Sequence, residues 1–299
     1  MKIGVTRPPT PPYPVPDVDG ALIAKHAEHL GFESIFFGEH PVTPLDEPGY
    51  SVHAHGVPYF QDPLTTLARA SGMTSRIMLG GGVFLLPEHN PVMFAKQLAN
   101  LDHYSGGRVI CGGGVGWSRL ECELCGGDFD RRWAQTRDFV GVMKALWTQE
   151  RATYEGEFFT LPPTRVFPGP VQPGGPPVLL GGKLTDRMVH RVAEYADGWI
   201  AVLLSDAAIE SAPALAIEAE RRLSAEARRI GRAPADLSVT LILRGDQVDG
   251  DTSPRRLPGR DVLLRLEDTG VDRICITLPT CLTERDAEEA LERIAERAL

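Results

Sequence analysis

The sequence predicts an α/β fold, a (β/α)₈ TIM barrel that takes up residues 1–299 as a single domain. Short apolar segments alternate along the chain with longer segments of helical periodicity, and eight such pairs can be found. Several short segments, such as PVLL and WIAVLL, lack alternating polar positions, which is typical of strands buried on both faces of a parallel sheet. An open doubly wound sheet is the rival arrangement, but eight βα units in a chain of 299 residues favour closure into a barrel.

Each predicted strand is followed by a predicted helix. The strands are expected at residues 2–6, 34–38, 77–84, 109–113, 178–181, 198–203, 237–243 and 273–278. The helices are expected at residues 19–30, 63–74, 91–104, 131–148, 184–196, 206–231, 260–269 and 283–298. The last helix places its apolar residues at helical spacing, and Thr283 followed by Asp286 predicts a cap at its start.

Two segments interrupt this alternation. Residues 150–177 form an excursion between the fourth and fifth strands that is rich in proline and glycine, and its TYEGEFFTL stretch predicts a small β-hairpin. Residues 40–62 form a long loop after the second strand, and loops of that length in compact domains are usually functional. We expect this loop to cover the substrate site, with Tyr50, Tyr59 and Phe60 contacting the substrate.

Composition and charge narrow the classes of partner. The formal net charge of −9 argues against nucleic acid or an anionic membrane surface as the main partner. The chain has no apolar run of membrane-spanning length, and its start lacks the apolar stretch of a signal peptide. We therefore expect a cytoplasmic protein that acts on a small molecule.

Two motifs suggest metal binding or redox chemistry, but another explanation is preferred for each. Cys122 and Cys125 have no second ligand pair at zinc spacing, so packing within a helix is the preferred interpretation. His53 and His55 lie in a loop and not at a strand end, and no further metal ligands accompany them. No metal site is therefore expected.

The active site of a (β/α)₈ barrel lies at the C-terminal ends of its strands, and this rule selects candidate residues. The second strand ends at Glu39 and His40, and an imidazole there can transfer protons, bind a cofactor edge or hold a loop. Glu39 has the character of a buried carboxylate that pairs with an arginine or caps the next loop. Glycines cluster after the third, fourth and fifth strands, where backbone could approach a flat or phosphorylated ligand. Lys183 precedes a helix N-terminus, which favours phosphate binding.

The chain also resembles a known family over about its first 200 residues. The stretches EHLGFESIFFGEH, QDPLTTLARASGMTSRIMLGGGVFLLPEHN, GGRVICGGGVGWSRLECELCG, YEGEFF and GGKLTDRMVHRVAEYADGW resemble the luciferase-like monooxygenases. The proline-rich start and VPYFQDPL look most like the branch that uses coenzyme F420. The resemblance implies a (β/α)₈ barrel enzyme that binds a flavin or deazaflavin at its mouth.

The resemblance also implies roles for particular residues. His40 matches the active-site histidine of the family, and Glu39 beside it is the second candidate catalytic residue. The bond between Gly82 and Val83 matches a cis peptide under the central ring of the cofactor. The cofactor phosphate falls near five residues after the fourth and fifth strands, which are Val115, Gly116, Gly181, Gly182 and Lys183.

Trp117 departs from the pattern of one subgroup of this family. It stands where sugar-phosphate dehydrogenases of the family carry a proton-donating glutamate, so their substrate and proton scheme should not be transferred. Trp117 is expected to stack over the cofactor or to form a wall of the substrate site.

These observations lead to one preferred function and three alternatives. The preferred function is F420-dependent hydride transfer to or from a small organic substrate, and a basic track through Lys183, Arg187 or Arg119 would favour F420 by binding its acidic tail. An FMN-dependent monooxygenase that uses reduced flavin and O₂ is the near alternative. A non-catalytic flavin-binding protein and a metal-dependent barrel hydrolase are the others. A homodimer is expected by analogy with relatives.

Overall fold

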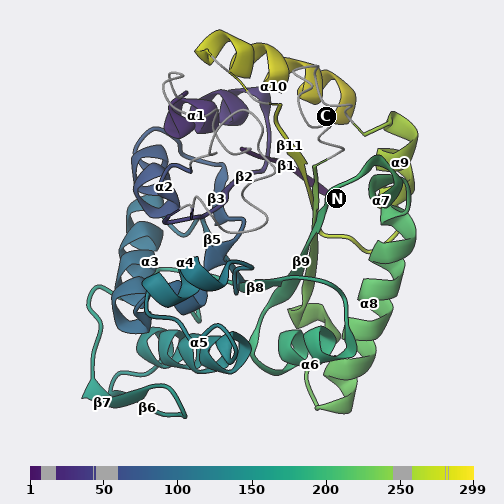
Figure 1. Ribbon diagram of the computed structural model, residues 1–299. Helices are drawn as coiled ribbons and strands as arrows, with labels where there is room; N and C mark the ends of the chain where they lie inside the picture. The colour runs from purple at the N-terminus through teal and green to yellow at the C-terminus, as the bar shows by residue number, and fades with distance from the viewer. Residues whose placement is uncertain (8–17, 43, 45–59, 245–257, 280, 282) are drawn as a thin grey trace.

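The computed structural model describes residues 1–7, 18–42, 44, 60–244, 258–279, 281 and 283–299. These residues form a barrel of parallel strands surrounded by a ring of helices, and Figure 1 looks along the barrel with the helices at its rim. No helix among the described residues is both long and apolar enough to cross a bilayer.

The eight strands of the barrel are close to the predicted ones. They are β1 (Lys2–Thr6), β2 (Ser34–Phe37), β3 (Met78–Gly81), β5 (Val109–Gly114), β8 (Val178–Gly181), β9 (Gly198–Leu203), β10 (Ser238–Leu243) and β11 (Arg273–Thr277). Their order is β3-β2-β1-β11-β10-β9-β8-β5, and pairing of β3 with β5 closes the sheet. The predicted closure is therefore confirmed. The predicted strand 77–84 is divided, because β4 (Phe84–Leu85) is a separate two-residue strand beside β5.

The helices lie outside the strands. They are α1 (Gly20–Leu30), α2 (Pro63–Ser71), α3 (Pro91–Ser105), α4 (Arg119–Leu124), α5 (Arg132–Thr148), α6 (Asp186–Tyr195), α7 (Asp206–Glu210), α8 (Ala212–Arg229), α9 (Arg260–Glu267) and α10 (Glu284–Ala298), with 3₁₀ turns η1 (Leu86–Glu88) and η2 (Pro234–Asp236). The single helix expected over 206–231 is two helices, since the chain turns at Ser211 and Pro213 lies in the first turn of the second. The cap predicted for α10 is confirmed as a full capping box of Thr283 and Asp286.

Inward-facing side chains fill the barrel, so its interior is packed. A cluster at the barrel centre comprises Phe36, Ile110, Leu179, Ile200, Ile242 and Cys275, all nearly inaccessible to solvent. Glycine on neighbouring strands makes room for the largest of them, because a Cβ on Gly80 would lie 2.4 Å from the ring of Phe36. A much larger apolar layer lies between the strands and the helices. Together these layers bury the apolar surface that stabilises the barrel.

The excursion before β8 contains the predicted hairpin. Strands β6 (Ala152–Glu155) and β7 (Thr160–Thr164) pair antiparallel. Asp138 of α5 anchors the hairpin, because its carboxylate accepts hydrogen bonds from the Tyr154 hydroxyl at 3.0 Å and the Phe158 amide at 2.7 Å. The hairpin therefore packs on the outer helix layer, at the edge of the molecule in Figure 1.

An ion pair between a buried arginine and a partly buried glutamate joins the first and last parts of the barrel. Nε and Nη2 of Arg273, at the start of β11, each lie 2.8 Å from a different carboxylate oxygen of Glu33, the residue before β2. Arg273 is only 6% exposed. This two-pronged contact holds β11 and β2 on either side of β1.

Candidate active site

His40 lies just beyond the C-terminal end of β2 and is held by a carboxylate from another part of the chain. Its Nδ1 is 2.7 Å from Oε2 of Glu121 on α4. The side chain of Glu121 is fully buried, and that of His40 is 15% exposed. Oε1 of Glu121 also accepts from the backbone amide of Val42, at 3.4 Å. Glu121 thus binds both the imidazole and the backbone that follows it.

The short helix α4 fixes the position of Glu121. Ser118 caps this helix, because its hydroxyl accepts a hydrogen bond from the amide of Glu121 at 3.0 Å. Ser118 is fully buried and follows β5 by four residues. The carboxylate therefore sits one turn into a helix whose start is fixed to a barrel strand. In the sheet, β3 separates the strand that precedes His40 from the strand that precedes Glu121.

Aromatic rings border His40. The centroid of Phe60 is 4.8 Å from that of His40, and the centroid of Trp117 is 5.9 Å away with its ring edge-on. Trp117 is 48% exposed although it follows the buried end of β5. Trp117 therefore lies beside His40, and its expected role, stacking over the cofactor or forming a wall of the substrate site, stays a prediction. Tyr50 and Tyr59, which were expected to contact the substrate, lie outside the described residues.

Glu39 turns to a different partner from its neighbour His40. Its side chain is buried, and Oε2 accepts hydrogen bonds from the amide of Leu85 at 2.6 Å and from Nε2 of His89 at 2.9 Å. Glu39 therefore holds the segment after β3, as expected of a carboxylate that caps the next loop. The side chain that pairs with it is a histidine, whereas an arginine was the expected partner. A catalytic role for Glu39 stays a prediction.

A third carboxyl group, Glu88 at the end of η1, lies beside these two. It is 7% exposed, and neither of its oxygens has a hydrogen-bond partner among the described residues. Burial, with added repulsion from Glu121 and Glu39, raises the pKa of Glu88 to about 8. Glu88 is therefore mainly a neutral carboxylic acid at neutral pH. Gly116 leaves space for it, since a Cβ there would lie 2.9 Å from Oε1 of Glu88.

The glycine clusters at the strand ends have a different use from the one predicted. A Cβ on Gly114 would lie 2.5 Å from the side chain of Val83, and one on Gly181 would lie 2.8 Å from it. A Cβ on Gly81 would lie 2.2 Å from the ring of Phe84. These glycines thus make room for side chains of the barrel itself. Their role as positions where a ligand approaches the backbone stays a prediction. The peptide bond between Gly82 and Val83 is cis, as predicted.

The two segments predicted to hold a phosphate leave neighbouring strands. Val115 and Gly116 follow β5, whereas Gly182 and Lys183 follow β8, and β5 pairs with β8. Lys183 is exposed and lies three residues before the first residue of α6, whose start is capped by Thr185. The barrel therefore brings the predicted phosphate residues to one side of its mouth, and their role in binding stays a prediction.

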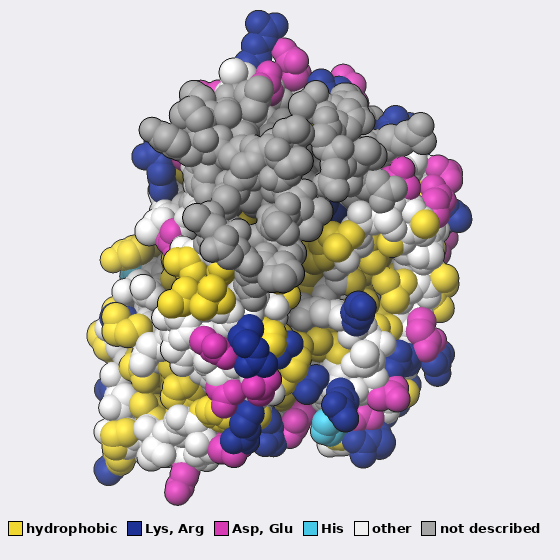
Figure 2. All heavy atoms as spheres, viewed as in Figure 1, with side chains coloured by type: hydrophobic (Ala, Val, Ile, Leu, Met, Phe, Trp, Pro, Cys, Tyr) yellow, Lys and Arg dark blue, Asp and Glu magenta, His cyan; other side chains and the backbone are white. Residues whose placement is uncertain are grey.

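Two basic residues at the mouth, Arg119 and Arg244, have different surroundings. Arg119 lies 2.9 Å from Glu123 and 3.0 Å from Asp130, so its guanidinium already faces carboxylates. Arg244 follows β10 and is half-buried, and burial lowers its pKa. Figure 2 shows basic and acidic side chains intermixed on the described part of this face, next to hydrophobic side chains. The described part of this face therefore has no large patch of purely positive or purely negative charge.

The structure describes one of the two motifs that suggested metal or redox chemistry, the cysteine pair. Cys122 is buried and Cys125 is half-buried, and both are free thiols whose pKa values are raised first by burial. The placement of the cysteines agrees with packing. His53 and His55 lie outside the described residues.

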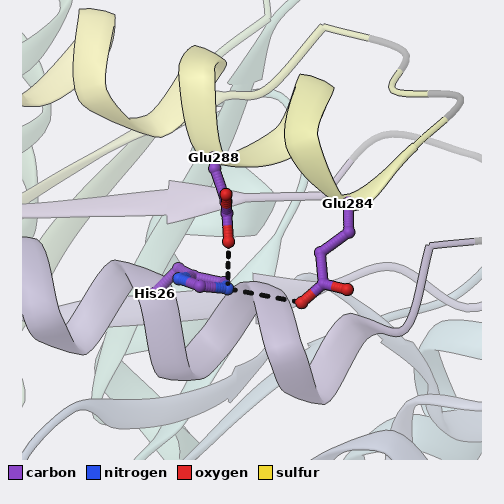
Figure 3. A group of neighbouring side chains, drawn as sticks. All are labelled: His26, Glu284 and Glu288. Carbon is purple, nitrogen blue, oxygen red and sulfur yellow. Dashed lines mark hydrogen bonds and ion pairs between the residues drawn. The ribbon is translucent and has the colours of Figure 1, made fainter.

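One group among the described residues could hold a metal ion, and it lies between outer helices. Nε2 of His26 on α1 is 2.8 Å from Glu288 and 3.5 Å from Glu284, both on α10 (Figure 3). The N–H of the imidazole explains this contact without an ion, because it can donate to either carboxylate.

Sequence reasoning missed Glu121 and Glu88. A signal for Glu121 was present, since Ser118-x-x-Glu121 after a strand is the pattern of a helix N-terminus with an acidic third position. That pattern predicts α4 but not its contact with His40, which is 81 positions away in the sequence. For Glu88, the neighbouring apolar residues and Pro87 gave no sign of a buried acid.

Comparison with known proteins identifies the family. The model for luciferase-like monooxygenases matches residues 13–244, which is more than half of the chain. The chain belongs to the luciferase-like monooxygenase family. An uncharacterized protein of Mycobacterium tuberculosis is 40% identical over 191 residues, covering 60% of this chain and 66% of that protein. An F420-dependent glucose-6-phosphate dehydrogenase of Intrasporangium calvum is 30% identical over 180 residues, covering 58% of this chain and 50% of the dehydrogenase. The matched regions thus span less than two thirds of these relatives.

Solved structures of luciferase-like proteins share the fold along nearly the whole chain. A monooxygenase from Streptomyces bottropensis superimposes with a TM-score of 0.79 at 20% identity, covering 99% of this chain and 98% of the other. An F420-dependent secondary alcohol dehydrogenase superimposes with a TM-score of 0.74 at 16% identity, covering 99% and 97%. At these identities the likeness shows the fold.

Proposed function

We propose that this luciferase-like protein catalyses hydride transfer between coenzyme F420 and a small organic substrate at the C-terminal mouth of its barrel. The observation that supports this most is the placement of His40, whose imidazole is held by a buried carboxylate at a strand end. F420-dependent enzymes among both the relatives and the solved structures favour the deazaflavin over FMN.

The residues at the mouth fit a flat cofactor that carries a phosphate. Val83 packs on the apolar barrel centre, and Trp117 stands beside His40, so apolar and aromatic surfaces border the imidazole. Lys183 and the amides before α6 offer a cation and hydrogen-bond donors to a phosphate. Arg119 contributes less to binding an acidic tail than the sequence suggested, because it is already paired with acidic residues.

A bound deazaflavin supplies or accepts a hydride, in two-electron steps. When hydride reaches an electrophilic carbon, the neighbouring heteroatom needs a proton, and His40 donates it. In the reverse direction His40 takes that proton as the hydride leaves. The aromatic rings next to His40 exclude water from this transfer.

The substrate is proposed only as a class. Trp117 has no acidic group, so this site lacks the proton donor that the resemblance implies for sugar-phosphate dehydrogenases, and a sugar phosphate is not the proposed substrate. An alcohol, or the carbonyl compound formed from it, suits a single proton-transferring imidazole beside apolar walls.

The assay for this proposal is anaerobic turnover of the purified protein. Oxidised F420 is offered with a panel of alcohols, and reduced F420 with the matching carbonyl compounds, while the visible absorbance of the deazaflavin is followed. The proposal expects enzyme-dependent reduction or oxidation of F420 by some members of the panel. Oxygen-dependent product formation with reduced FMN, and none with F420, would instead make the protein a flavin monooxygenase.

A further inference from the structure

Three buried carboxyl groups, Glu121, Glu39 and Glu88, lie close enough to interact electrostatically, and they differ in what they bind. Glu121 contacts Nδ1 of His40 at 2.7 Å, and Glu39 contacts Nε2 of His89 at 2.9 Å. Glu88 has no hydrogen-bond partner among the described residues. Buried carboxyl groups that lie close together repel one another when all are ionised, and this repulsion favours a proton on one of them.

The pattern of partners indicates which carboxyl is neutral. Glu121 and Glu39 each accept hydrogen bonds from a backbone amide and lie against an imidazole, which stabilises a negative charge. No such donor reaches Glu88, and the raised pKa of its carboxyl agrees with this assignment. The proton of the cluster therefore belongs to Glu88, and Glu121 faces His40 as a carboxylate.

An ionised carboxylate can only accept hydrogen bonds, so the hydrogen in the contact of 2.7 Å must come from Nδ1 of His40. In the neutral ring the other nitrogen, Nε2, is then the basic one. We propose that Glu121 is a positioning residue for His40, and that its carboxylate keeps the hydrogen on Nδ1 and thereby makes Nε2 the nitrogen that handles protons. This inference rests on the proposed function only for the use made of Nε2.

The arrangement is built to resist rotation of the imidazole. Glu121 holds the ring at Nδ1 and holds the backbone beyond it at the amide of Val42, so the ring and its segment move together. The Ser118 cap ties the carboxylate to β5. The predicted phosphate residues Val115 and Gly116 lie in the same segment, between β5 and α4. This segment would therefore position both the cofactor phosphate and, through Glu121, the ring of His40.

The test reads the tautomer of His40 directly and needs no cofactor. The full chain is labelled with ¹⁵N-histidine, and long-range proton–nitrogen spectra are recorded between pH 6 and pH 7.5, below the pKa of about 8 of Glu88. The tautomer is read where the nitrogen shifts of His40 are those of a neutral ring. The signals of His40 among the eight histidines are assigned by their loss in His40→Gln. The wild-type protein is expected to show the hydrogen on Nδ1.

Two matched variants complete the experiment. Glu121→Gln puts an amide against the ring that can donate to Nδ1, so the population with the hydrogen on Nε2 should rise at least tenfold. Glu88→Gln replaces a neighbouring group that is already neutral, and should leave the tautomer unchanged. With a substrate in hand, Glu121→Gln should lower kcat by about 100-fold while the Kd of the cofactor stays within about twofold.

Two results would overturn the inference. One is a wild-type spectrum that shows the hydrogen of His40 on Nε2. This result would overturn the inference even if Glu121→Gln does not fold. The other is a folded Glu121→Gln protein with the wild-type tautomer. If the protein proves not to use F420, the tautomer results still decide the role of Glu121, so the two proposals fail separately.

Discussion

Replacing Glu88 by glutamine keeps the size of the side chain but removes the titration of a buried acid. In the folded protein the pKa of Glu88 is raised from its ordinary value of 4.5 to about 8. Between these values the unfolded chain releases a proton that the folded chain keeps. The contribution of Glu88 to the free energy of unfolding is therefore complete below pH 4.5 and is lost as the pH rises to 8.

The size of the effect follows from this difference. Each pKa unit corresponds to about 1.4 kcal/mol, so the wild-type protein should lose about 2.5 kcal/mol from this group between pH 5 and pH 7, and about 4 kcal/mol by pH 9. Glu88→Gln lacks this loss. The free energy of unfolding of the variant minus that of the wild type should therefore rise by those amounts over the same range of pH.

Urea unfolding of both proteins at pH 5, 7 and 9 measures this difference, and other groups that titrate equally in both proteins cancel. The slopes of the two unfolding curves must agree at each pH for the comparison to hold. A difference that stays constant with pH would show that Glu88 ionises normally in the folded protein. The assignment of the proton to Glu88 would then be refuted.

Three further predictions concern the site and the barrel. His40→Ala should lower turnover about 100-fold while the cofactor still binds, and unchanged turnover would remove His40 from the reaction. Lys183→Glu should weaken cofactor binding about tenfold or more through the phosphate, measured by fluorescence titration, and the exposed Lys25→Glu on α1 is the control that should not. Arg273→Met should lower the free energy of unfolding by about 2 kcal/mol, because the partly buried Glu33 keeps only its longer printed contact, to Lys2 at 3.6 Å. A loss in urea unfolding below about 0.5 kcal/mol would show that the Arg273–Glu33 pair does not stabilise the closure.

The barrel could be predicted from the sequence because its signals are local. Runs such as residues 198–203 are apolar throughout, and α10 shows its apolar spacing and its cap within 16 residues. The break between α7 and α8 was missed although Pro213 marks it, because the helical periodicity continues on both sides. The division of residues 77–84 depends on contacts between strands. Val83 packs against Gly114 and Gly181, and Phe84 packs against Gly81. Hydrophobic periodicity does not record such contacts.

The site could be predicted only in part. The strand-end rule located His40 and Glu39, since it needs only the strand boundaries. It could not separate them, because Glu39 turns toward Leu85 and His89 whereas His40 turns toward Glu121. That difference arises from contacts between segments brought together by closure of the barrel.

Parallel titration of the purified apoprotein with coenzyme F420 and with FMN tests the central claim most directly. Quenching or enhancement of cofactor fluorescence gives both dissociation constants under the same conditions. F420 is expected to bind saturably, with a lower dissociation constant than FMN, and Lys183→Glu should weaken its binding. Tight binding of FMN with no saturable binding of F420 would contradict this claim.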